Sequence, residues 1–339
     1  MNSENIQTSA TAEKGSLRIV YMGTPEFAVE PLRCLVEGGY HVVGVVTMPD
    51  KPAGRGHKLR QSPVKEYAVR QGLPLLQPEK LKEESFLEQL RAWKADLQIV
   101  VAFRMLPEVV WNMPPKGTFN LHASLLPQYR GAAPINWAVI HGERETGLTT
   151  FFLTHEIDTG EVIRQVRVPI AEEDNVGVVH DRLMKEGGPL VIETVEDILR
   201  GTVKSVPQNQ LPVERELKPA PKLFKETCRI DWTRTTRQVY DFIRGLSPYP
   251  AAWAELVNGA GESIVVKIFE SEKVTGETPR KPGTLQTDGK NFLRVATADG
   301  YVAVTSLQFP GKKRLTIQEV LQGYRIAPGA FMKTELLTI

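Results

Sequence analysis

The stretch Leu17-Arg18-Ile19-Val20-Tyr21-Met22-Gly23-Thr24-Pro25 decides the expected fold of this chain. Its apolar run stops at Gly23, and Pro25 suits the first turn of a helix, where no backbone N–H donor is needed. Apolar residues at helical spacing follow until Gly38-Gly39, a pair that is typical of a helix end. The valine-rich run 41–48 then has the composition of a strand buried on both faces. Strand, helix and strand in this order predict the first unit of a parallel sheet.

The same alternation continues as far as residue 199. Further strands are predicted near residues 73–76, 97–103, 117–122, 149–154 and 161–168. Helices are predicted near residues 63–71, 84–94, 107–112 and 178–199. The sequence therefore predicts a Rossmann-like, doubly wound, mostly parallel α/β sheet. The first strand-to-helix turn contains one glycine, Gly23, where a dinucleotide fingerprint needs three, so an NAD site is not expected.

Prolines interrupt this pattern after residue 206. Between residues 207 and 226 they stand among charged residues, which is the composition of a linker. Short alternating segments separated by turn signals follow, at residues 253–257, 264–269, 283–286, 292–296 and 301–309. Their spacing predicts a small β-barrel such as an OB-fold. We therefore expect four regions: a disordered tail over 1–15, an α/β domain over 16–206, a linker over 207–226 and an OB-like barrel over 227–339.

The composition limits the possible classes of protein. Apolar residues make up 41% and charged residues 24% of the chain, as in ordinary globular proteins. No apolar run approaches the roughly 20 residues of a membrane helix, and the N-terminal residues lack the apolar segment of a secretory signal. Cys34 and Cys228 have no metal-ligand spacing. We expect a reduced cytoplasmic protein without a membrane segment or a metal site.

Charge is distributed unevenly around the net value of +2. Residues 207–339 carry 19 Lys and Arg against 14 Asp and Glu, a balance of +5, whereas residues 1–206 carry 23 against 26. A basic C-terminal region fits a polyanionic partner, although a solvated basic face gives the same balance. All six histidines lie in the first region, so titratable chemistry is expected there.

Candidate catalytic residues lie in Phe119-Asn120-Leu121-His122-Ala123-Ser124-Leu125-Leu126-Pro127. Asn120 and His122 alternate on a predicted strand, so both side chains leave the same face near its carboxyl end, where open α/β sheets bind ligands. An amide donor beside an imidazole can stabilise a developing oxyanion, but the same spacing fits two side chains that satisfy buried backbone groups. Asp158, in the polar segment 155–161 between two strands, taken alone fits an ordinary turn residue.

Taken together, three segments resemble the catalytic core of the folate-dependent formyltransferases. They are Asn120-Leu121-His122-Ala123-Ser124-Leu125-Leu126-Pro127, Arg130-Gly131-Ala132-Ala133-Pro134-Ile135 and Asp158-Thr159-Gly160. Their order, spacing and residue types match the family, with a small residue, Ala123, at a position where the family also has a small residue. The resemblance runs from about residue 17 to the C-terminus. Further segments resemble the branch of the family that formylates methionyl-tRNA, namely 51–59, 220–223, 230–232 and Arg244 with 247–250.

The resemblance implies an enzyme that transfers the formyl group of 10-formyltetrahydrofolate to the α-amino group of initiator methionyl-tRNA for translation initiation. The amine would attack the formyl carbon, and Asn120 and protonated His122 would donate hydrogen bonds to the resulting oxyanion. Asp158 would keep His122 charged and help to relay the proton of the amine to the departing N10. The resemblance implies neither a metal nor a covalent enzyme intermediate, and it implies a monomer.

The resemblance also implies binding residues. A folate-binding segment is expected at Ser124, Leu125, Leu126 and Pro127. The wall of the pterin pocket is expected at Phe103, Arg104, Met105 and Leu106, although Arg104 fits a solvated charge almost as well. A basic loop that enters the acceptor stem of tRNA is expected at Lys51, Arg55, His57, Lys58 and Arg60. The same loop also fits a solvated excursion rich in glycine and proline, and we expect it to be poorly ordered without tRNA.

Two other functions fit parts of the sequence. An amino-sugar-nucleotide formyltransferase shares the catalytic core, but in our interpretation it lacks the basic loop after Asp50. A tRNA-binding module with an inactive formyltransferase fold is disfavoured because Asn120, His122 and Asp158 are all present. Lys312-Lys313-Arg314 is interpreted as the tip of a hairpin rather than as a tRNA contact.

Overall fold

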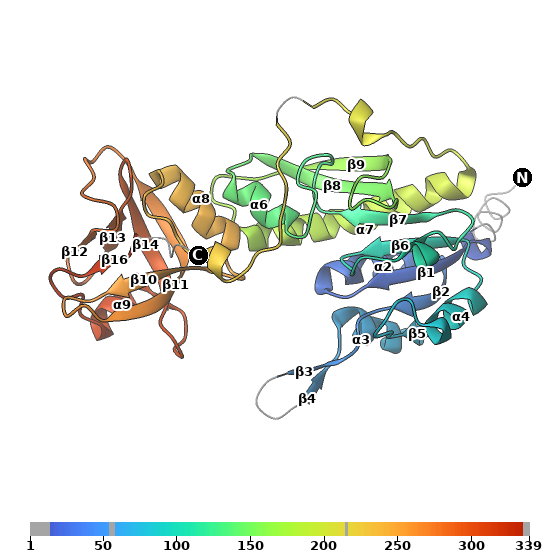
Figure 1. The fold of residues 1–339 in the computed structure, drawn as a ribbon, viewed down its shortest axis with the longest axis horizontal. Helices are drawn as coiled ribbons and strands as arrows, with labels where there is room; N and C mark the ends of the chain where they lie inside the picture. Colours follow the sequence, from blue (N-terminus) through green and yellow to red (C-terminus); the bar gives the residue numbers. More distant parts are fainter. Residues whose placement is uncertain (1–13, 54–57, 214–215, 335–339) are drawn as a thin grey trace, which may run out of the picture. The chain divides into compact units, whose positions relative to one another are not determined.

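The computed structural model describes residues 14–53, 58–213 and 216–334 (Figure 1). The chain divides into two compact units, each made of several segments. The first unit contains Met1–Gly131, Thr146–Val168 and His180–Pro219, and the second contains Ala132–Glu145, Pro169–Val179 and Ala220–Ile339. The chain therefore passes between the units several times, and the residues up to Pro219 of the expected linker belong to the first unit.

A seven-stranded sheet forms the centre of the first unit. Its strand order is β5-β2-β1-β6-β7-β8-β9. The strands are β1 (Arg18–Gly23), β2 (His41–Val46), β5 (Leu75–Leu76), β6 (Leu97–Val101), β7 (Thr118–His122), β8 (Glu145–Phe152) and β9 (Val162–Pro169). The first five strands in this order pair in parallel, and β8 runs antiparallel to β7. The expected mostly parallel α/β sheet is confirmed.

Helices follow the strands as the apolar patterns predict. They are α2 (Val29–Glu37), α3 (Pro63–Arg70), α4 (Glu84–Ala92), α5 (Glu108–Trp111) and α7 (Val176–Arg200). Every residue of β1 after Arg18 is buried, which explains its continuous apolar sequence. The long helix α7 packs against β7, where a Cβ on Gly187 would lie 3.1 Å from a methyl group of Leu121. Within the described residues, no helix is long and apolar enough to cross a membrane.

The second unit contains an antiparallel sheet that is nearly closed into a barrel. Its order is β12-β13-β14-β11-β10-β16, with β15 paired to β14. The strands are β10 (Ala252–Val257), β11 (Ser263–Val274), β12 (Leu285–Thr287), β13 (Leu293–Ala296), β14 (Tyr301–Gln308), β15 (Leu315–Thr316) and β16 (Phe331–Met332). A bridge between Thr284 and Phe331 connects the two ends of this order. The expected small β-barrel is confirmed, and residues 312–314 lie in the connection between β14 and β15.

The second unit also has helices that the apolar pattern did not predict. They are α6 (Pro134–Ile140), α8 (Thr236–Leu246) and α9 (Ile317–Gly323). Helices α6 and α8 approach each other closely at Gly245, where a Cβ would lie 2.8 Å from the backbone nitrogen of Ile140. Thr235 caps α8 through a capping box with Gln238, so the sequence does carry a signal for where this helix begins.

The described ends of the basic loop form a two-stranded ribbon. Strand β3 (Lys51–Ala53) pairs antiparallel with β4 (Lys58–Arg60), so that Lys51 lies opposite Arg60. At the base of the ribbon, Asp50 forms a 2.6 Å ion pair with Lys65 and accepts a hydrogen bond from Gln77. Lys65 and the Gln77 amide lower the pKa of Asp50, so its carboxylate stays charged at neutral pH. These contacts hold Asp50, the residue before β3, in place.

Candidate active site

Asn120 and His122 lie on β7 with one residue between them, and both side chains leave the same face of the strand. Asn120 is half-buried between its strand partners Val100 on β6 and Phe151 on β8. Within the described part of the chain, no residue forms a hydrogen bond with the Asn120 side-chain amide. Among the residues that the structure describes, this amide is therefore a donor without a partner, and it lies at the carboxyl edge of a parallel sheet, where such folds bind their ligands.

His122 is held from two sides. Its side chain is almost buried, with the whole residue 7% exposed, and its ring lies nearly perpendicular to that of Phe151, in a T-shaped arrangement. The Nε2 atom lies 2.9 Å from the carbonyl oxygen of Tyr129, and Nδ1 lies 3.8 Å from Oδ2 of Asp158. A carbonyl oxygen only accepts, so the Nε2 atom carries the hydrogen of this bond, and the Nδ1 side of the ring faces the Asp158 carboxylate.

Asp158 lies in the loop between β8 and β9 in a left-handed conformation, with φ of 54°. Its Oδ2 accepts a 2.9 Å hydrogen bond from the backbone nitrogen of Gly131. Two residues further on, a Cβ on Gly160 would lie 1.6 Å from the carbonyl oxygen of Phe152, so only glycine fits there. These contacts explain the sequence Asp158-Thr159-Gly160: the loop must pass close to the end of β8 while it directs the carboxylate toward His122.

A buried glutamine that sequence reasoning missed supports the same loop. Gln208 donates hydrogen bonds to the carbonyl oxygens of Asp158 and Gly160 and accepts two from the guanidinium of Arg130. Fifty positions separate Gln208 from Asp158, and the surrounding sequence has the composition of a linker. No local pattern therefore marked this residue.

The expected folate segment 124–127 is a turn held by buried hydrogen bonds. Ser124 is fully buried, and its hydroxyl donates to the carbonyl oxygen of Gln128 at 2.6 Å. The Thr149 hydroxyl donates to the Ser124 carbonyl and accepts from the backbone nitrogen of Leu126. Gln165 donates to both the Leu126 carbonyl and the Thr149 hydroxyl. Leu126 and Pro127 are buried and Leu125 is half-buried, so the side chain of Ser124 supports the turn from within.

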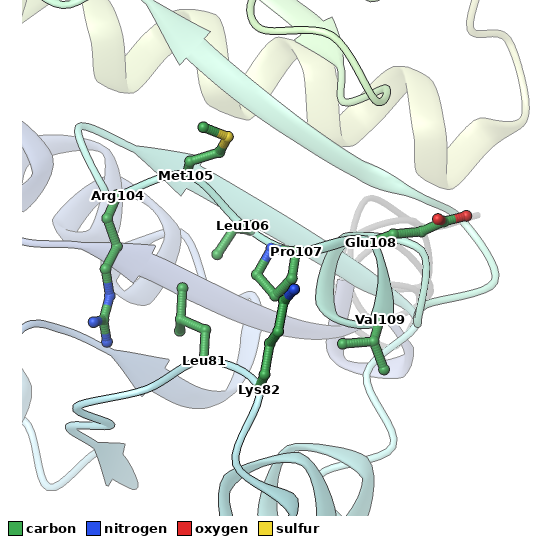
Figure 2. A pocket seen from close by; sticks show the side chains of 8 residues that line it. All are labelled: Leu81, Lys82, Arg104, Met105, Leu106, Pro107, Glu108 and Val109. Atoms are coloured by element: carbon green, nitrogen blue, oxygen red, sulfur yellow. The ribbon is translucent and has the colours of Figure 1, made fainter.

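The expected pterin segment 103–106 borders a pocket of about 670 Å³ (Figure 2). Arg104, Met105 and Leu106 line this pocket, whereas Phe103 packs against the neighbouring hydrophobic core. The Met105 side chain is 70% exposed. The remaining lining residues are Leu81, Lys82, Pro107, Glu108 and Val109.

Arg104 is not a freely solvated charge. Its guanidinium donates hydrogen bonds to the carbonyl oxygens of Pro78 and Glu79, at 2.6 Å for the latter, and its buried Nε has no partner among the described residues. Figure 2 shows the side chain directed away from Met105. Burial lowers the pKa of this guanidinium. Arg104 therefore ties the segment after β6 to the chain before Leu81.

The predicted tRNA-binding residues are only partly described. Lys51 and Arg60 are exposed at the base of the ribbon, and Lys58 begins β4. Arg55 and His57 lie outside the described residues. No group of three or more His, Cys, Asp or Glu side chains in the described ranges is arranged to hold a metal ion.

Comparisons with known proteins identify the family. The model named "Formyl transferase" matches residues 17–195, and the model named "Formyl transferase, C-terminal domain" matches residues 222–325. Methionyl-tRNA formyltransferase of Bacteroides fragilis is 71% identical over 321 residues, which cover 95% of this chain and 99% of the relative. That of Porphyromonas gingivalis is 50% identical over 95% of this chain and 100% of the relative.

Solved structures of more distant proteins share the fold. HypX from Aquifex aeolicus, in complex with tetrahydrofolic acid, is 23% identical, with a TM-score of 0.59 over 90% of this chain and 47% of that chain. The sugar 3N-formyl transferase WlaRD is 16% identical, with a TM-score of 0.60 over 88% of this chain and 99% of that chain. The family models and the close relatives decide the assignment: the chain belongs to the formyl transferase family, and within it to the methionyl-tRNA formyltransferases.

Proposed function

We propose that this chain transfers the formyl group of 10-formyltetrahydrofolate to the α-amino group of initiator methionyl-tRNA, giving N-formylmethionyl-tRNA for translation initiation. The observation that carries the proposal is the meeting of Asn120, His122 and Asp158 at one edge of the sheet. The names of the close relatives support methionyl-tRNA as the acceptor. The structure of HypX, part of which shares this fold, contains tetrahydrofolic acid, which supports a folate as the formyl donor.

Asn120 acts as the first hydrogen-bond donor in this proposal. Its unpartnered amide is available to the formyl oxygen, which gains negative charge when the amine attacks the formyl carbon. Because β6 and β8 fix the strand on both sides, the donor does not need to reorganise during the reaction. A donor that is fixed in advance stabilises the transition state more than the ground state, and this difference accelerates the reaction.

His122 and Asp158 provide the second donor and the charge that supports it. The Nε2 hydrogen of His122 is used by the Tyr129 carbonyl, which leaves the Nδ1 side of the ring for the reaction. The 3.8 Å separation between Nδ1 and Asp158 Oδ2 exceeds a hydrogen bond, so an oxygen of the substrate or a water molecule can share the Nδ1 hydrogen. The Asp158 carboxylate stabilises the imidazolium and, through water, accepts the proton that the amine loses on its way to N10.

The binding roles follow from the positions of the other candidates. The turn 124–127 and the segment 103–106 hold the folate, mainly through backbone groups, because the polar side chains of Ser124 and Arg104 are already bonded within the protein. The ribbon cations Lys51, Lys58 and Arg60, together with Arg55 and His57 of the same loop, bind tRNA phosphates. We also propose that the protein is a cytoplasmic monomer with a catalytic domain over 16–206, a linker over 207–226 and a tRNA-binding barrel over 227–339.

A competition between acceptors tests this function. The protein is given 10-formyltetrahydrofolate with either methionyl initiator tRNA or a nucleotide-linked amino sugar, and uncharged tRNA serves as the control. We expect formylation of methionyl-tRNA alone, because the basic ribbon matches a phosphate backbone. Formylation of the amino sugar in its place contradicts the proposal, and no transfer to any acceptor refutes an enzymatic role under these conditions.

A further inference from the structure

Gln208 lies just beyond α7, in the short 3-10 turn Gln208–Gln210. Its exposed fraction is 4%, whereas both Asn209 and Gln210 are exposed. A long polar side chain is rarely buried in this way unless its amide is fully bonded. The burial therefore indicates a specific task for Gln208 that its two neighbours in the turn do not share.

The amide of Gln208 connects two segments of the active site. Its Nε2 donates to the carbonyl oxygens of Asp158 and Gly160 at 2.8 and 2.9 Å. Its Oε1 accepts from Nε and Nη2 of Arg130 at 3.0 and 2.6 Å. A guanidinium only donates and a carbonyl only accepts, so these partners permit one orientation of the amide.

Arg130 is the middle residue of the run 129–131, and this run contacts His122, Gln208 and Asp158. The Tyr129 carbonyl accepts from His122, Arg130 bonds to Gln208, and the Gly131 nitrogen donates to the Asp158 carboxylate. Gln208 thus closes a ring of contacts, because it bonds to Arg130 on one side and to the Asp158 loop on the other. Within this ring the Asp158 backbone adopts a left-handed conformation that is unfavourable for a residue with a side chain.

The chain around Gln208 is fixed to the same unit. Val206 and Val162 exchange two backbone hydrogen bonds, of 2.9 and 2.8 Å. Leu211 packs against the buried cluster that contains Leu126 and Phe151. Further along, the Lys218 carbonyl accepts from the Tyr129 nitrogen at 2.8 Å. These contacts fix residues 206–211 against the first unit, so Gln208 lies in an anchored segment and not in a free linker.

We infer that Gln208 is a positioning residue, which holds Asp158 at the distance from His122 that formyl transfer requires. This inference rests on the proposed function of the site. Gln208 touches neither reacting group, so its effect passes through the Asp158 loop. When its amide is removed, the carbonyls of Asp158 and Gly160 lose a buried donor and the loop can relax. A shift of about 1 Å in such a group lowers turnover by up to about 100-fold.

The test compares Gln208→Ala and Gln208→Glu with the control Gln210→Ala in the full chain. Glutamate keeps the volume of Gln208 but presents oxygens to the two carbonyls, so it distinguishes lost packing from lost hydrogen bonding. We expect both Gln208 variants to lower kcat for methionyl-tRNA by about 10- to 100-fold, with the KM for the folate within about threefold of wild type. Gln210→Ala should match wild type. Wild-type kcat for both Gln208 variants overturns the inference.

A double-mutant cycle shows whether Gln208 acts through Asp158. In the Asp158→Asn background, Gln208→Ala should lower kcat by less than about twofold, because the group that it positions has already lost its charge. If Gln208→Ala lowers kcat by the same factor in both backgrounds, the inference is overturned. It is also overturned if the loss of kcat equals the loss of folded protein measured by thermal unfolding. If wild type itself does not formylate methionyl-tRNA, the proposed function fails, and that result is distinct from a failure of the Gln208 variants to differ from an active wild type.

Discussion

Polar side chains of the site around His122 are buried and bonded, whereas the described polar side chains of the ribbon β3–β4 are exposed. In the site, His122, Asp158 and Gln208 have partners within a few ångströms, and these partners are mostly backbone groups. In the ribbon, Lys51 and Arg60 are exposed, and the fixed contacts lie below them. With the proposed roles, the two regions use polar residues in two ways: the groups proposed to act on a reacting atom are fixed in advance, whereas those proposed to attract a large anion remain in solvent.

Physical chemistry explains this division. A hydrogen-bond donor accelerates a reaction only if it already points to where charge develops, which requires buried and bonded surroundings. Phosphates on a nucleic acid are numerous and hydrated, and cations bind them largely through the release of counterions. We therefore expect variants of the site to change the rate of the chemical step and variants of the ribbon to change the affinity for tRNA.

The largest effect is expected for Asp158→Asn. An amide can still accept the hydrogen bond from Gly131, so the loop should keep its shape, but the negative charge beside His122 on which the proposed mechanism depends is lost. We expect kcat to fall by about 10³-fold or more. Single-turnover rates at saturating substrates provide the measurement, and thermal unfolding provides the control for folding. A near-normal rate would remove Asp158 from the mechanism.

A somewhat smaller effect is expected for Asn120→Ala. The substitution removes an amide that bonds to no described residue, so the stability of the protein should change little. We expect kcat to fall by about 10²- to 10³-fold, as it does when one oxyanion donor is removed, and the Kd for the folate to stay near that of wild type. A large change in folate affinity with unchanged kcat would assign Asn120 to binding instead.

Arg55→Ala should change tRNA binding rather than the rate of the chemical step. The planar guanidinium can bridge two phosphate oxygens or read a base edge, as lysine cannot. We expect the KM for methionyl-tRNA to rise by about tenfold or more, with folate affinity unchanged, and the dependence of binding on salt to become shallower. Lys116→Ala is the control, because Lys116 is exposed before the amino end of β7. If Arg55→Ala has the same KM for methionyl-tRNA as wild type, the loop is a solvated excursion that does not bind tRNA.

The smallest effect is expected for Thr149→Val. This variant tests whether folate binding needs the turn 124–127 to be held by its buried hydrogen bonds. The substitution leaves the Leu126 nitrogen without its acceptor. This should lower the free energy of unfolding by about 1–3 kcal/mol. We expect a several-fold higher KM for the folate and little change in kcat. Thr150→Val is the matched control, since Thr150 lies on the same strand and bonds to Thr194. If both variants affect only stability, the turn has no part in folate binding.

Local sequence predicted the framework of the first unit well. Strands such as β1 and β2 are buried on both faces, so their apolar runs are nearly continuous and easy to recognise. Helix α8 was missed although the capping box between Thr235 and Gln238 marks its start. Strands β15 and β16 have two residues each, which is too short for any alternation to appear.

The candidate site likewise contains residues that local sequence predicts and residues that it does not. Asn120 and His122 share a strand, so their common face follows from alternation alone. The meeting of His122 with Asp158 depends on a loop that follows the antiparallel strand β8, and only the family resemblance brought these residues together before the structure. Gln208 could not be predicted, because a contact across fifty positions leaves no trace in local composition.

The most direct test of this account measures single-turnover formylation over a range of methionyl-tRNA concentrations. Wild type is compared with Asn120→Ala and with the double variant Lys51→Ala/Arg60→Ala, whose two residues face each other across the ribbon. We expect Asn120→Ala to stay about 10²- to 10³-fold slow at saturating tRNA, and the double variant to reach nearly the wild-type rate at about tenfold higher tRNA concentration. A double variant that remains slow at saturation, or an Asn120→Ala variant that reaches the wild-type rate, would contradict the account.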